Sequence, residues 1–285
     1  MVVYNKNKPI RLIELFAGIG SQAMALRNIG IPFEHYRAIE YDKYAIASYN
    51  AIHNTDFPTI DITSVSGSDL GIVDTDIYTY LLTYSFPCQD LSVAGKMKGM
   101  QKGSGTRSGL LWEVERLLNE TDELPQILVM ENVPQVHSKK NMSDFQKWVN
   151  YLSSRGYKTF WQDMNAVDYG IPQSRNRCFA VSILGEDDFK FPSPIKLTST
   201  IKDCLEEQVE DKYYLTNDKA KKLIDSLIID GKIGIRGGHT VTGIDLTIKN
   251  PDSLSVANCI KARYDCGISN QQSDGTGVIE CQRLR

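Results

Sequence analysis

The stretch that decides the fold is RLIELFAGIGS, residues 11–21. Its first six residues have the composition of a β-strand, and a turn with two glycines follows. Ser21 is a suitable N-cap for a helix, because apolar residues recur at the helical spacing through Ala23, Leu26 and Ile29. The order strand, glycine turn, helix is typical of the opening of a doubly wound α/β fold. The glycines let a ligand approach the backbone, and the helix N-terminus adds a partial positive charge.

Two acidic residues extend this pattern. The fingerprint G-x-G-x-x-G is incomplete, because Ala23 stands at the third glycine position, and this opening is shared by dehydrogenases and methyltransferases. A strand expected at 36–39 ends in Glu40, about 20 residues after the glycine turn, where a carboxylate suits ribose hydroxyls. Asp61 and Ile62 are expected at the end of a short third strand, where a carboxylate could accept from an adenine amino group. The alternative is that Asp61 is a turn or cap residue.

A second motif is TYSFPCQD, residues 83–90. An apolar run from 77 to 86 has strand composition and ends in Pro87, followed by Cys88. Proline prevents the strand from continuing, so the thiol is presented at the carboxyl edge of the sheet, where open α/β sheets bind ligands. An isolated cysteine is more often a small buried hydrophobe. The functional interpretation therefore depends on the other motifs.

The same arrangement recurs at residues 126–130, an apolar strand pattern followed by Glu131. The functional interpretation is an acid at a strand tip, and the alternative is a helix-capping carboxylate. Farther along, Arg175 and Arg177 precede a strand pattern and stand two residues apart, so on an extended segment they share one face. Their planar guanidinium groups suit a base carbonyl or a phosphate, whereas the alternative is a solvated edge.

The segment after Cys88 is a long loop rich in glycine and lysine. Roughly 20 residues there lack apolar periodicity, which is unusual in a compact domain unless the loop is functional. Its composition suits a loop that closes over a polyanion. Ser108 is expected to cap the next helix. Further elements are expected as helices at 43–53 and 143–154 and a strand at 157–164.

Composition limits the class of protein. The chain has 285 residues and a net charge of −3, which does not by itself favour nucleic acid. Two local stretches, 91–112 and 232–263, are basic and are candidate phosphate contacts. No apolar run approaches the length of a membrane span, and the polar start lacks a secretory signal. The six cysteines form no C-x-x-C pair and the four histidines are scattered, so we expect no metal site and a reduced, cytoplasmic setting.

Taken together, these motifs resemble the DNA (cytosine-5)-methyltransferase family, whose order and spacing they follow over residues 10–183. The resemblance implies an α/β fold: a doubly wound, Rossmann-like, S-adenosylmethionine-dependent catalytic domain at 1–184. It implies a small, mostly β target-recognition region at 185–285. The motifs that carry it are Phe16-Ala17-Gly18-Ile19-Gly20, Pro87-Cys88-Gln89, Glu131-Asn132-Val133 and Gln173-x-Arg175-x-Arg177.

The resemblance also implies the chemistry, which is transfer of a methyl group to C5 of a cytosine flipped out of duplex DNA. It implies that Cys88 attacks C6 as a thiolate, that Glu131 contacts N3, and that Arg177 holds O2 with Arg175 close by. The residues implied to hold S-adenosylmethionine are Phe16, Ala17, Gly18, Gly20, Glu40, Tyr41, Asp61, Ile62, Pro87 and Leu111. Those implied to bind the substrate are Ser85, Gln89, Asn132 and Gln173.

The sequence departs from the family after the recognition region, because two further family motifs are not found before Arg285. We therefore expect a truncated chain or one subunit of a split enzyme, with weak or no activity alone. A second chain that supplies the missing motifs is the partner this expectation implies. Duplex DNA is the other implied partner, no membrane is involved, and a cognate restriction endonuclease is left open. The implied setting is a bacterial cell or a phage-infected host.

Two alternatives remain beside DNA cytosine methylation. A tRNA cytosine-5 methyltransferase would share the catalytic motifs. A truncated, non-catalytic module that binds DNA or cofactor would account for the missing C-terminal motifs, although intact Cys88, Glu131 and Arg177 argue against it. A dehydrogenase explains the glycine turn but neither of the motifs at Cys88 and Glu131.

Overall fold

The structure is a computed structural model that describes residues 8–91 and 99–204. Beyond these it describes residues 206, 210, 222, 225–226, 229, 241–245, 256–258 and 276–280. By its contacts the chain divides into two compact units, Met1–Met164 with Arg177–Phe191, and Asn165–Asn176 with Pro192–Arg285. Residues 165–176 thus group with the second unit, although the predicted domain boundary lies after 184. The functional roles of the two predicted domains stay predictions.

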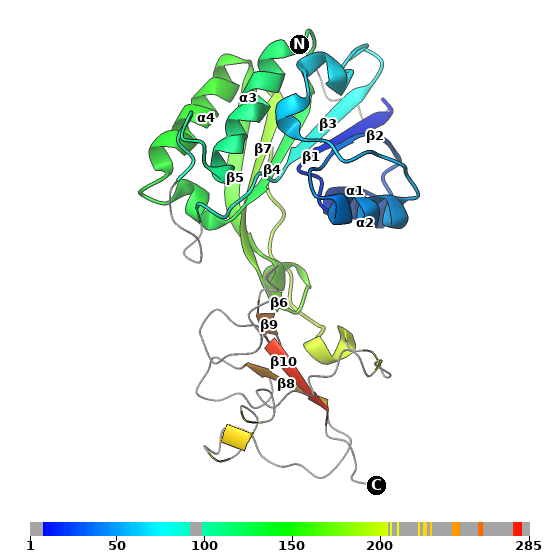
Figure 1. Ribbon diagram of the computed structural model, residues 1–285, viewed down its shortest axis with the longest axis vertical. Helices are drawn as coiled ribbons and strands as arrows, with labels where there is room; N and C mark the ends of the chain where they lie inside the picture. Colours follow the sequence, from blue (N-terminus) through cyan, green and yellow to red (C-terminus); the bar gives the residue numbers. More distant parts are fainter. Residues whose placement is uncertain are drawn as a thin grey trace. The chain divides into compact units, whose positions relative to one another are not determined.

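The first unit is built on a six-stranded sheet in the order β2-β1-β3-β4-β7-β5 (Figure 1). Pairs β1–β2, β1–β3 and β3–β4 are parallel, and β4–β7 is antiparallel. The strands are β1 (Ile10–Leu15), β2 (Phe33–Ile39), β3 (Thr79–Tyr84), β4 (Ile127–Asn132), β5 (Tyr157–Asn165) and β7 (Asn176–Leu184). This mixed sheet confirms the predicted α/β class.

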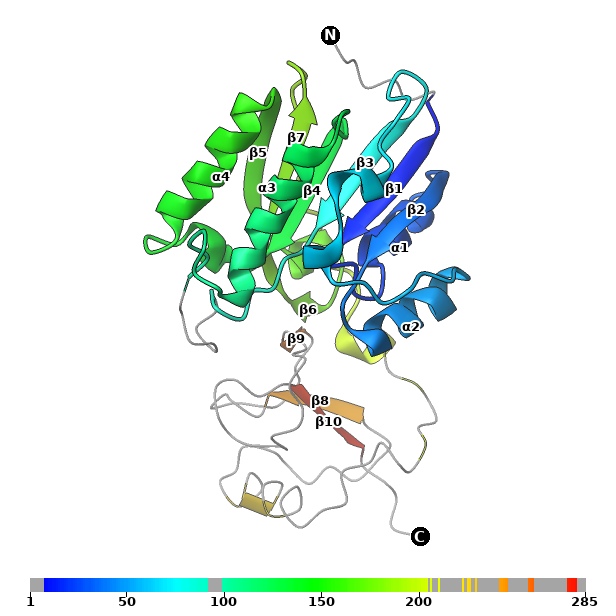
Figure 2. The same cartoon turned by 45° about the horizontal axis from the view of Figure 1, so that its top comes forward.

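Four α-helices cover the sheet: α1 (Ser21–Asn28), α2 (Lys43–His53), α3 (Leu111–Glu120) and α4 (Met142–Ser154). Figures 1 and 2 show α3 and α4 side by side against β4, β7 and β5, with α1 and α2 beside β1 and β2. Short 3₁₀ turns connect these elements: η1 (Ile62–Ser64), η2 (Gly67–Leu70), η3 (Arg107–Leu110), η4 (Pro134–His137), η5 (Ala166–Tyr169) and η6 (Ile201–Cys204).

The core lies on both faces of the sheet. Ala38 packs with Ile46 and Tyr49 of α2, whereas the next residue, Ile39, packs into the larger cluster that contains Trp148 of α4. Because successive strand side chains point to opposite faces, the two clusters lie on opposite faces of the sheet. The unit therefore has three layers, with helices on both sides, as a doubly wound fold requires.

The register of the parallel strands aligns their carboxyl ends. Leu15 of β1 pairs with Ile39 of β2 and with Tyr84 of β3, and Tyr84 pairs with Met130 of β4. The residues directly after these partners therefore lie along one edge of the sheet. They are Phe16, Glu40, Ser85 and Glu131. Four motifs that are far apart in sequence are thus brought to one edge by strand register alone.

The described part of the second unit contains short strand pairs. β6 (Gln173–Ser174) pairs in parallel with β9 (Ala257–Asn258), and β8 (Val241–Asp245) pairs antiparallel with β10 (Thr276–Glu280). Among all described residues, no helix is long and apolar enough to cross a membrane.

Two local predictions were wrong. Residues 55–61 form no strand, and Asp61 instead caps η1, where its Oδ1 accepts from the Thr63 amide at 2.9 Å and the Thr63 hydroxyl at 2.8 Å. Ser21 is the first helical residue rather than the N-cap, because Gly20 occupies the cap position in the left-handed region. In both cases a short polar side chain fitted more than one local structure.

Candidate active site

The turn after β1 has a backbone that few side chains permit. Phe16, Gly18 and Gly20 all have positive φ, at 57°, 56° and 78°. A Cβ on Gly20 would overlap the rings of His53 and Tyr49, whereas a Cβ on Gly18 would meet nothing within 4 Å. Gly20 is therefore required by packing on α2. Gly18 instead faces open space, where a ligand can reach the backbone.

Glu40 connects the glycine turn to the start of α2. Its Oε2 accepts from the Gly18 amide at 2.8 Å and its Oε1 accepts from the Asp42 amide at 2.8 Å. The buried Ala17 donates its amide to Ile39 at 3.1 Å, which holds the turn against β2. Tyr41, the next residue along, is 74% exposed and presents its ring to solvent. This edge thus combines exposed backbone, a fixed carboxylate and an aromatic face.

Three of the remaining predicted cofactor residues lie on two further segments, and the fourth, Pro87, directly precedes Cys88. Asp61 is exposed and Ile62 is buried, on the loop that follows α2. That loop is joined to the strand edge, because the Ile60 amide donates to the Glu40 carbonyl at 2.8 Å. Leu111, the first residue of α3, is fully buried. These positions and the open backbone at Gly18 fit a nucleoside ligand at this edge.

Cys88 is half-buried in a tight turn after β3, closed by a hydrogen bond from the Leu91 amide to the Cys88 carbonyl at 3.0 Å. The turn is fastened to η3 by Ser108, whose buried hydroxyl donates to the Pro87 carbonyl at 2.6 Å. Asp90 adds a second link, since its Oδ2 accepts from the Arg107 amide at 2.8 Å. The cysteine turn is therefore fixed at both ends.

Ser108 was expected to cap a helix, and this prediction was wrong. The cap of η3 is Thr106, whose side chain accepts from the Gly109 amide. Ser108 lies inside the turn, and its Oγ also accepts from the Asp90 amide at 3.3 Å. Residues 92–98 of the predicted glycine- and lysine-rich loop lie outside the described residues.

The predicted substrate residues around Cys88 have different surroundings. Asn132 is 2% exposed, and its Nδ2 donates to the Phe86 carbonyl at 2.9 Å, directly before Pro87. Gln89 is exposed and accepts from Arg107 Nη1 at 2.5 Å, and Ser85 accepts from Gln22 of α1 at 3.2 Å. Asn132 therefore holds the start of the Pro-Cys turn from its buried side.

Glu131 and Arg177 form an ion pair that was not predicted. Arg177 Nε lies 3.0 Å from Glu131 Oε1, with 18% and 20% of the two side chains exposed. The antiparallel register pairs Glu131 with Phe179, which makes Arg177 its diagonal neighbour on the same face. The pair follows from the reversed direction of β7, which neither motif reveals separately.

Gln173 and Arg175 belong to the second unit. Arg175 lies between β6 and β7, so the predicted extended segment is interrupted there. Its amide donates to Asn165 Oδ1 at 2.9 Å and to the Gln173 carbonyl at 3.0 Å. Its carbonyl accepts from Ala166 at 3.0 Å. The backbone of Arg175 is thus fixed within that unit.

One buried acid escaped the sequence analysis. Glu14, the second-last residue of β1, is fully buried, and its Oε2 accepts from the Tyr49 hydroxyl at 2.6 Å. Its Oε1 has no hydrogen-bond partner among the described residues. Burial raises the pKa of Glu14 to about 7, although hydrogen bonds from Tyr49 and the Ala23 amide oppose the shift. The sequence does contain a signal for this buried acid, which is a single carboxylate within a mostly apolar strand.

A possible metal-binding group also went unpredicted. His137, Asp163 and Cys178 place potential ligand atoms within 4.8 Å of one another. His137 Nε2 and Asp163 Oδ1 already contact each other at 2.8 Å. Burial raises the pKa of the Cys178 thiol to about 12, and the charges of Asp163 and Glu131 add to the effect. Proximity alone does not identify a metal site, and His137 and Asp163 already pair with each other, so we assign no metal to this group.

Comparison with known protein families identifies the family to which this candidate site belongs. The model of the C-5 cytosine-specific DNA methylase family matches residues 10–244. The chain belongs to this family. Its members are DNA (cytosine-5-)-methyltransferases that use S-adenosylmethionine as methyl donor, which confirms the resemblance, the enzyme class and the cofactor expected from the sequence.

Individual relatives agree with the family match. The Type II methyltransferase M2.ScrFI of Lactococcus lactis subsp. cremoris is 35% identical over 264 residues, covering 74% of this chain and 71% of the relative. The orphan methyltransferase M.SssI of Spiroplasma monobiae is 36% identical over 269 residues, covering 75% and 69%. The Type II methyltransferase M.HhaI of Haemophilus parahaemolyticus is 32% identical over 255 residues, covering 84% and 73%.

Solved structures support the fold. S. pombe Dnmt2 methyltransferase superposes with a TM-score of 0.64 at 22% identity, covering 93% of this chain and 74% of that protein. Entamoeba histolytica methyltransferase EhMeth superposes with a TM-score of 0.62 at 19% identity, covering 89% and 77%. At these identities the likeness establishes the methyltransferase fold and nothing more specific.

Proposed function

We propose that this methyltransferase acts on a cytosine flipped out of duplex DNA and proceeds through a covalent bond between Cys88 and C6. The observation that carries the proposal is the strand register, which brings the Cys88 turn, the Glu131–Arg177 pair and the glycine turn to one sheet edge. Extrusion of the base is required because C5 and C6 cannot be reached in a stacked pair.

The proposed chemistry uses three side chains. Cys88, as a thiolate, adds to C6, and the electron pair displaced from the C5–C6 bond makes C5 nucleophilic. Glu131 contacts N3 and supports its protonation, while Arg177 holds O2 and keeps Glu131 in place through their ion pair. Carbon 5 then takes the methyl group. Loss of the C5 proton, departure of the Cys88 thiolate and release of the N3 proton restore the ring and the enzyme.

The cofactor is assigned to the glycine turn side of the edge. When bound there, S-adenosylmethionine supplies an electrophilic methyl group. The backbone at Gly18, the carboxylate of Glu40 and the ring of Tyr41 would hold its nucleoside, with Asp61 and Ile62 at the adenine. Phe16, Ala17, Gly20, Pro87 and Leu111 complete the proposed pocket.

The partners are also part of this proposal. The proposed substrate is a specific duplex DNA sequence, read by the region after residue 184. Ser85, Gln89, Gln173 and Arg175 are proposed to contact the flipped base or its strand, and Asn132 to act by holding the Pro-Cys turn. A cognate restriction endonuclease is proposed from the Type II names of relatives.

Trapping of the covalent bond tests this function. Duplex DNA carrying 5-fluorocytosine cannot lose fluorine from C5, so a Cys88–C6 bond would persist and shift the protein on a denaturing gel. We expect an adduct that requires S-adenosylmethionine and disappears in Cys88→Ser. Cys204→Ser is the control for the loss of a thiol elsewhere in the chain, because Cys204 is exposed and has no proposed role in the covalent chemistry.

The outcomes separate the alternatives. An adduct with both wild type and Cys204→Ser but not with Cys88→Ser supports the proposal. An adduct with fluorinated tRNA and none with DNA would favour the tRNA enzyme. An adduct that survives Cys88→Ser would refute the assigned nucleophile.

A further inference from the structure

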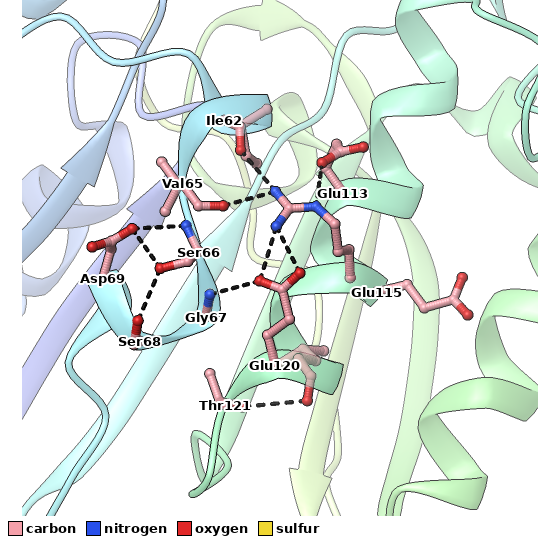
Figure 3. A network of polar contacts seen from close by, with 12 residues as sticks. Ile62, Val65, Ser66, Gly67, Ser68, Asp69, Glu113, Glu115, Glu120 and Thr121 are labelled. Atoms are coloured by element: carbon pink, nitrogen blue, oxygen red, sulfur yellow. Dashed lines mark hydrogen bonds and ion pairs between the residues drawn. The ribbon is translucent and has the colours of Figure 1, made fainter.

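Arg116, in the middle of α3, connects that helix to the loop formed by residues 61–70, which contains η1 and η2. Its Nη2 donates to the carbonyl oxygens of Ile62 at 3.1 Å and of Val65 at 2.8 Å (Figure 3). Both acceptors are backbone groups, so the contact fixes the path of the loop rather than any one of its side chains. Asp61 and Ile62, the proposed adenine contacts, begin this loop.

The other donors of Arg116 are used as well. Its Nε donates to Glu113 at 2.8 Å, and its Nη1 donates to both carboxylate oxygens of Glu120, at 3.0 Å and 2.9 Å. All five N–H donors of a guanidinium are therefore occupied. Burial acts to lower the pKa of Arg116, but its hydrogen bonds to the carboxylates of Glu113 and Glu120 outweigh burial and leave the pKa above its ordinary value. The cation is thus permanently charged and oriented.

A second link runs through Glu120. Its Oε2 accepts from the Gly67 amide at 2.9 Å, as Figure 3 also shows. Gly67 lies so close to the helix end that an added Cβ would stand 2.5 Å from the Glu120 carbonyl carbon and 2.7 Å from the Thr121 nitrogen. The loop backbone therefore rests directly on the end of α3.

We propose that Arg116 is a positioning residue for the adenine end of the cofactor. It holds Asp61 and Ile62 at a fixed place relative to α3, whose first residue is Leu111, so the two sides of the pocket keep their spacing. The inference rests on the proposed assignment of Asp61 and Ile62 to the adenine. Lysine cannot replace this arginine fully, because an ammonium lacks the planar fork that reaches two carbonyls and two carboxylates at once.

Cofactor analogues that differ at one adenine atom test this role. The dissociation constants of S-adenosylhomocysteine and S-inosylhomocysteine are measured by calorimetry with the full chain. The inosyl analogue has a carbonyl where adenine has its amino group, so a positioned Asp61 carboxylate favours the adenosyl form. We expect Arg116→Met to weaken the binding of S-adenosylhomocysteine about tenfold, which corresponds to the loss of one well-placed hydrogen bond. The ratio of the dissociation constants of the two analogues should approach one.

Arg155→Met is the matched control. Arg155 is also an arginine that donates to a backbone carbonyl of α3, from Nη2 to Leu118 at 3.0 Å, but it does not contact the loop. This variant should keep the preference between analogues. Arg116→Lys should give an intermediate preference, since charge remains near Glu113 and Glu120 while the two carbonyl contacts cannot both form.

Asp61→Asn separates the two levels of the inference, because asparagine still caps η1 while losing the charge. If this variant loses the preference and Arg116→Met retains it, the positioning role is overturned. If Arg116→Met loses the preference and Asp61→Asn retains it, the role of Arg116 stands and the assignment of Asp61 is wrong. If the wild type binds neither analogue, the proposed pocket and the role of Arg116 are both overturned.

Discussion

Two loops of the candidate active site are held in opposite ways. The Pro-Cys turn is held by hydrogen bonds from two buried side chains, the amide of Asn132, which is 2% exposed, and the hydroxyl of Ser108, which is fully buried. The loop that carries Asp61 is held from the surface, by Arg116 and Glu120, whose side chains are 33% and 40% exposed. One set of contacts is neutral and buried, and the other is ionic and partly solvated.

The difference matches the role that we propose for each loop, a nucleophile on one and a cofactor contact on the other. A nucleophile has to be placed within a fraction of an ångström, since a small displacement can reduce the rate steeply. Buried hydrogen bonds provide that accuracy, because losing one leaves its partner without water or protein. A loop that contacts a cofactor must let the ligand enter and leave, and partly exposed ionic contacts, which salt screens, permit this.

The largest effect is expected from Asn132→Leu, which removes the amide under the Pro-Cys turn. The Phe86 carbonyl would lose its buried donor, so we expect the free energy of unfolding to fall by about 1–3 kcal/mol. Displacement of Cys88 should slow formation of the fluorocytosine adduct by about 100-fold. Denaturant unfolding and the rate of adduct formation measure the two effects.

The matched control for this variant is Asn141→Leu. Asn141 is also buried, at 4% exposure, and donates from Nδ2 to the Gln135 carbonyl at 2.8 Å, so this hydrogen bond holds η4 rather than the Pro-Cys turn. It should lower stability by a similar amount while leaving the adduct rate nearly unchanged. Equal slowing by both variants would mean that Asn132 acts only through global stability.

A much smaller effect is expected from Glu113→Gln, which removes one charge from the Arg116 network. Exposed ion pairs contribute little, so stability should change by less than about 0.5 kcal/mol. Affinity for S-adenosylhomocysteine should fall by no more than about twofold, and the difference from wild type should vanish in about 1 M salt, where screening is short-ranged. Calorimetric titrations at low and high salt measure this.

Glu115→Gln provides the comparison on the same helix. Glu115 pairs with Lys102 at 2.8 Å and does not touch the loop. It should leave cofactor affinity unchanged at both salt concentrations. If the effect of Glu113→Gln on cofactor affinity persisted in high salt, salt would not screen the ionic contacts of Arg116. The contrast with the buried hydrogen bonds of the Pro-Cys turn would then fail.

The sequence predicted those parts of the fold that depend on local patterns. The bounds of α2 were predicted correctly, because Asp42 caps a helix whose apolar residues repeat at helical spacing and Asn54 ends it in the left-handed region. The strand at Cys88 was predicted two residues too long at each end, at 77–86 against Thr79–Tyr84, since composition does not mark where pairing stops.

Other features were not predictable because they depend on elements far apart in the chain. The ion pair of Glu131 with Arg177 requires the antiparallel placement of β7 next to β4. The hydrogen bonds from Arg116 to the carbonyls of Ile62 and Val65 require that α3 pack against a loop about 50 residues earlier in the chain. The sequence left two interpretations of Asp61 open, because a polar residue before Ile-Thr-Ser suits a strand end and a 3₁₀ cap equally, and the structure confirms the cap.

Because Glu14 is buried, the folded and unfolded chains bind different numbers of protons. Burial raises the pKa of this carboxyl from 4.5 to about 7, so near neutral pH the native protein retains a proton that the unfolded chain has released. The stability linked to this group is complete below the unfolded pKa and is lost as pH rises through about 7. Raising the pH from 4 to 8 should therefore destabilise the wild type by about 3 kcal/mol relative to Glu14→Gln, measured by denaturant unfolding. An equal pH dependence in both proteins would contradict this. Folding of the domain is, in this sense, also the uptake of a hydrogen ion.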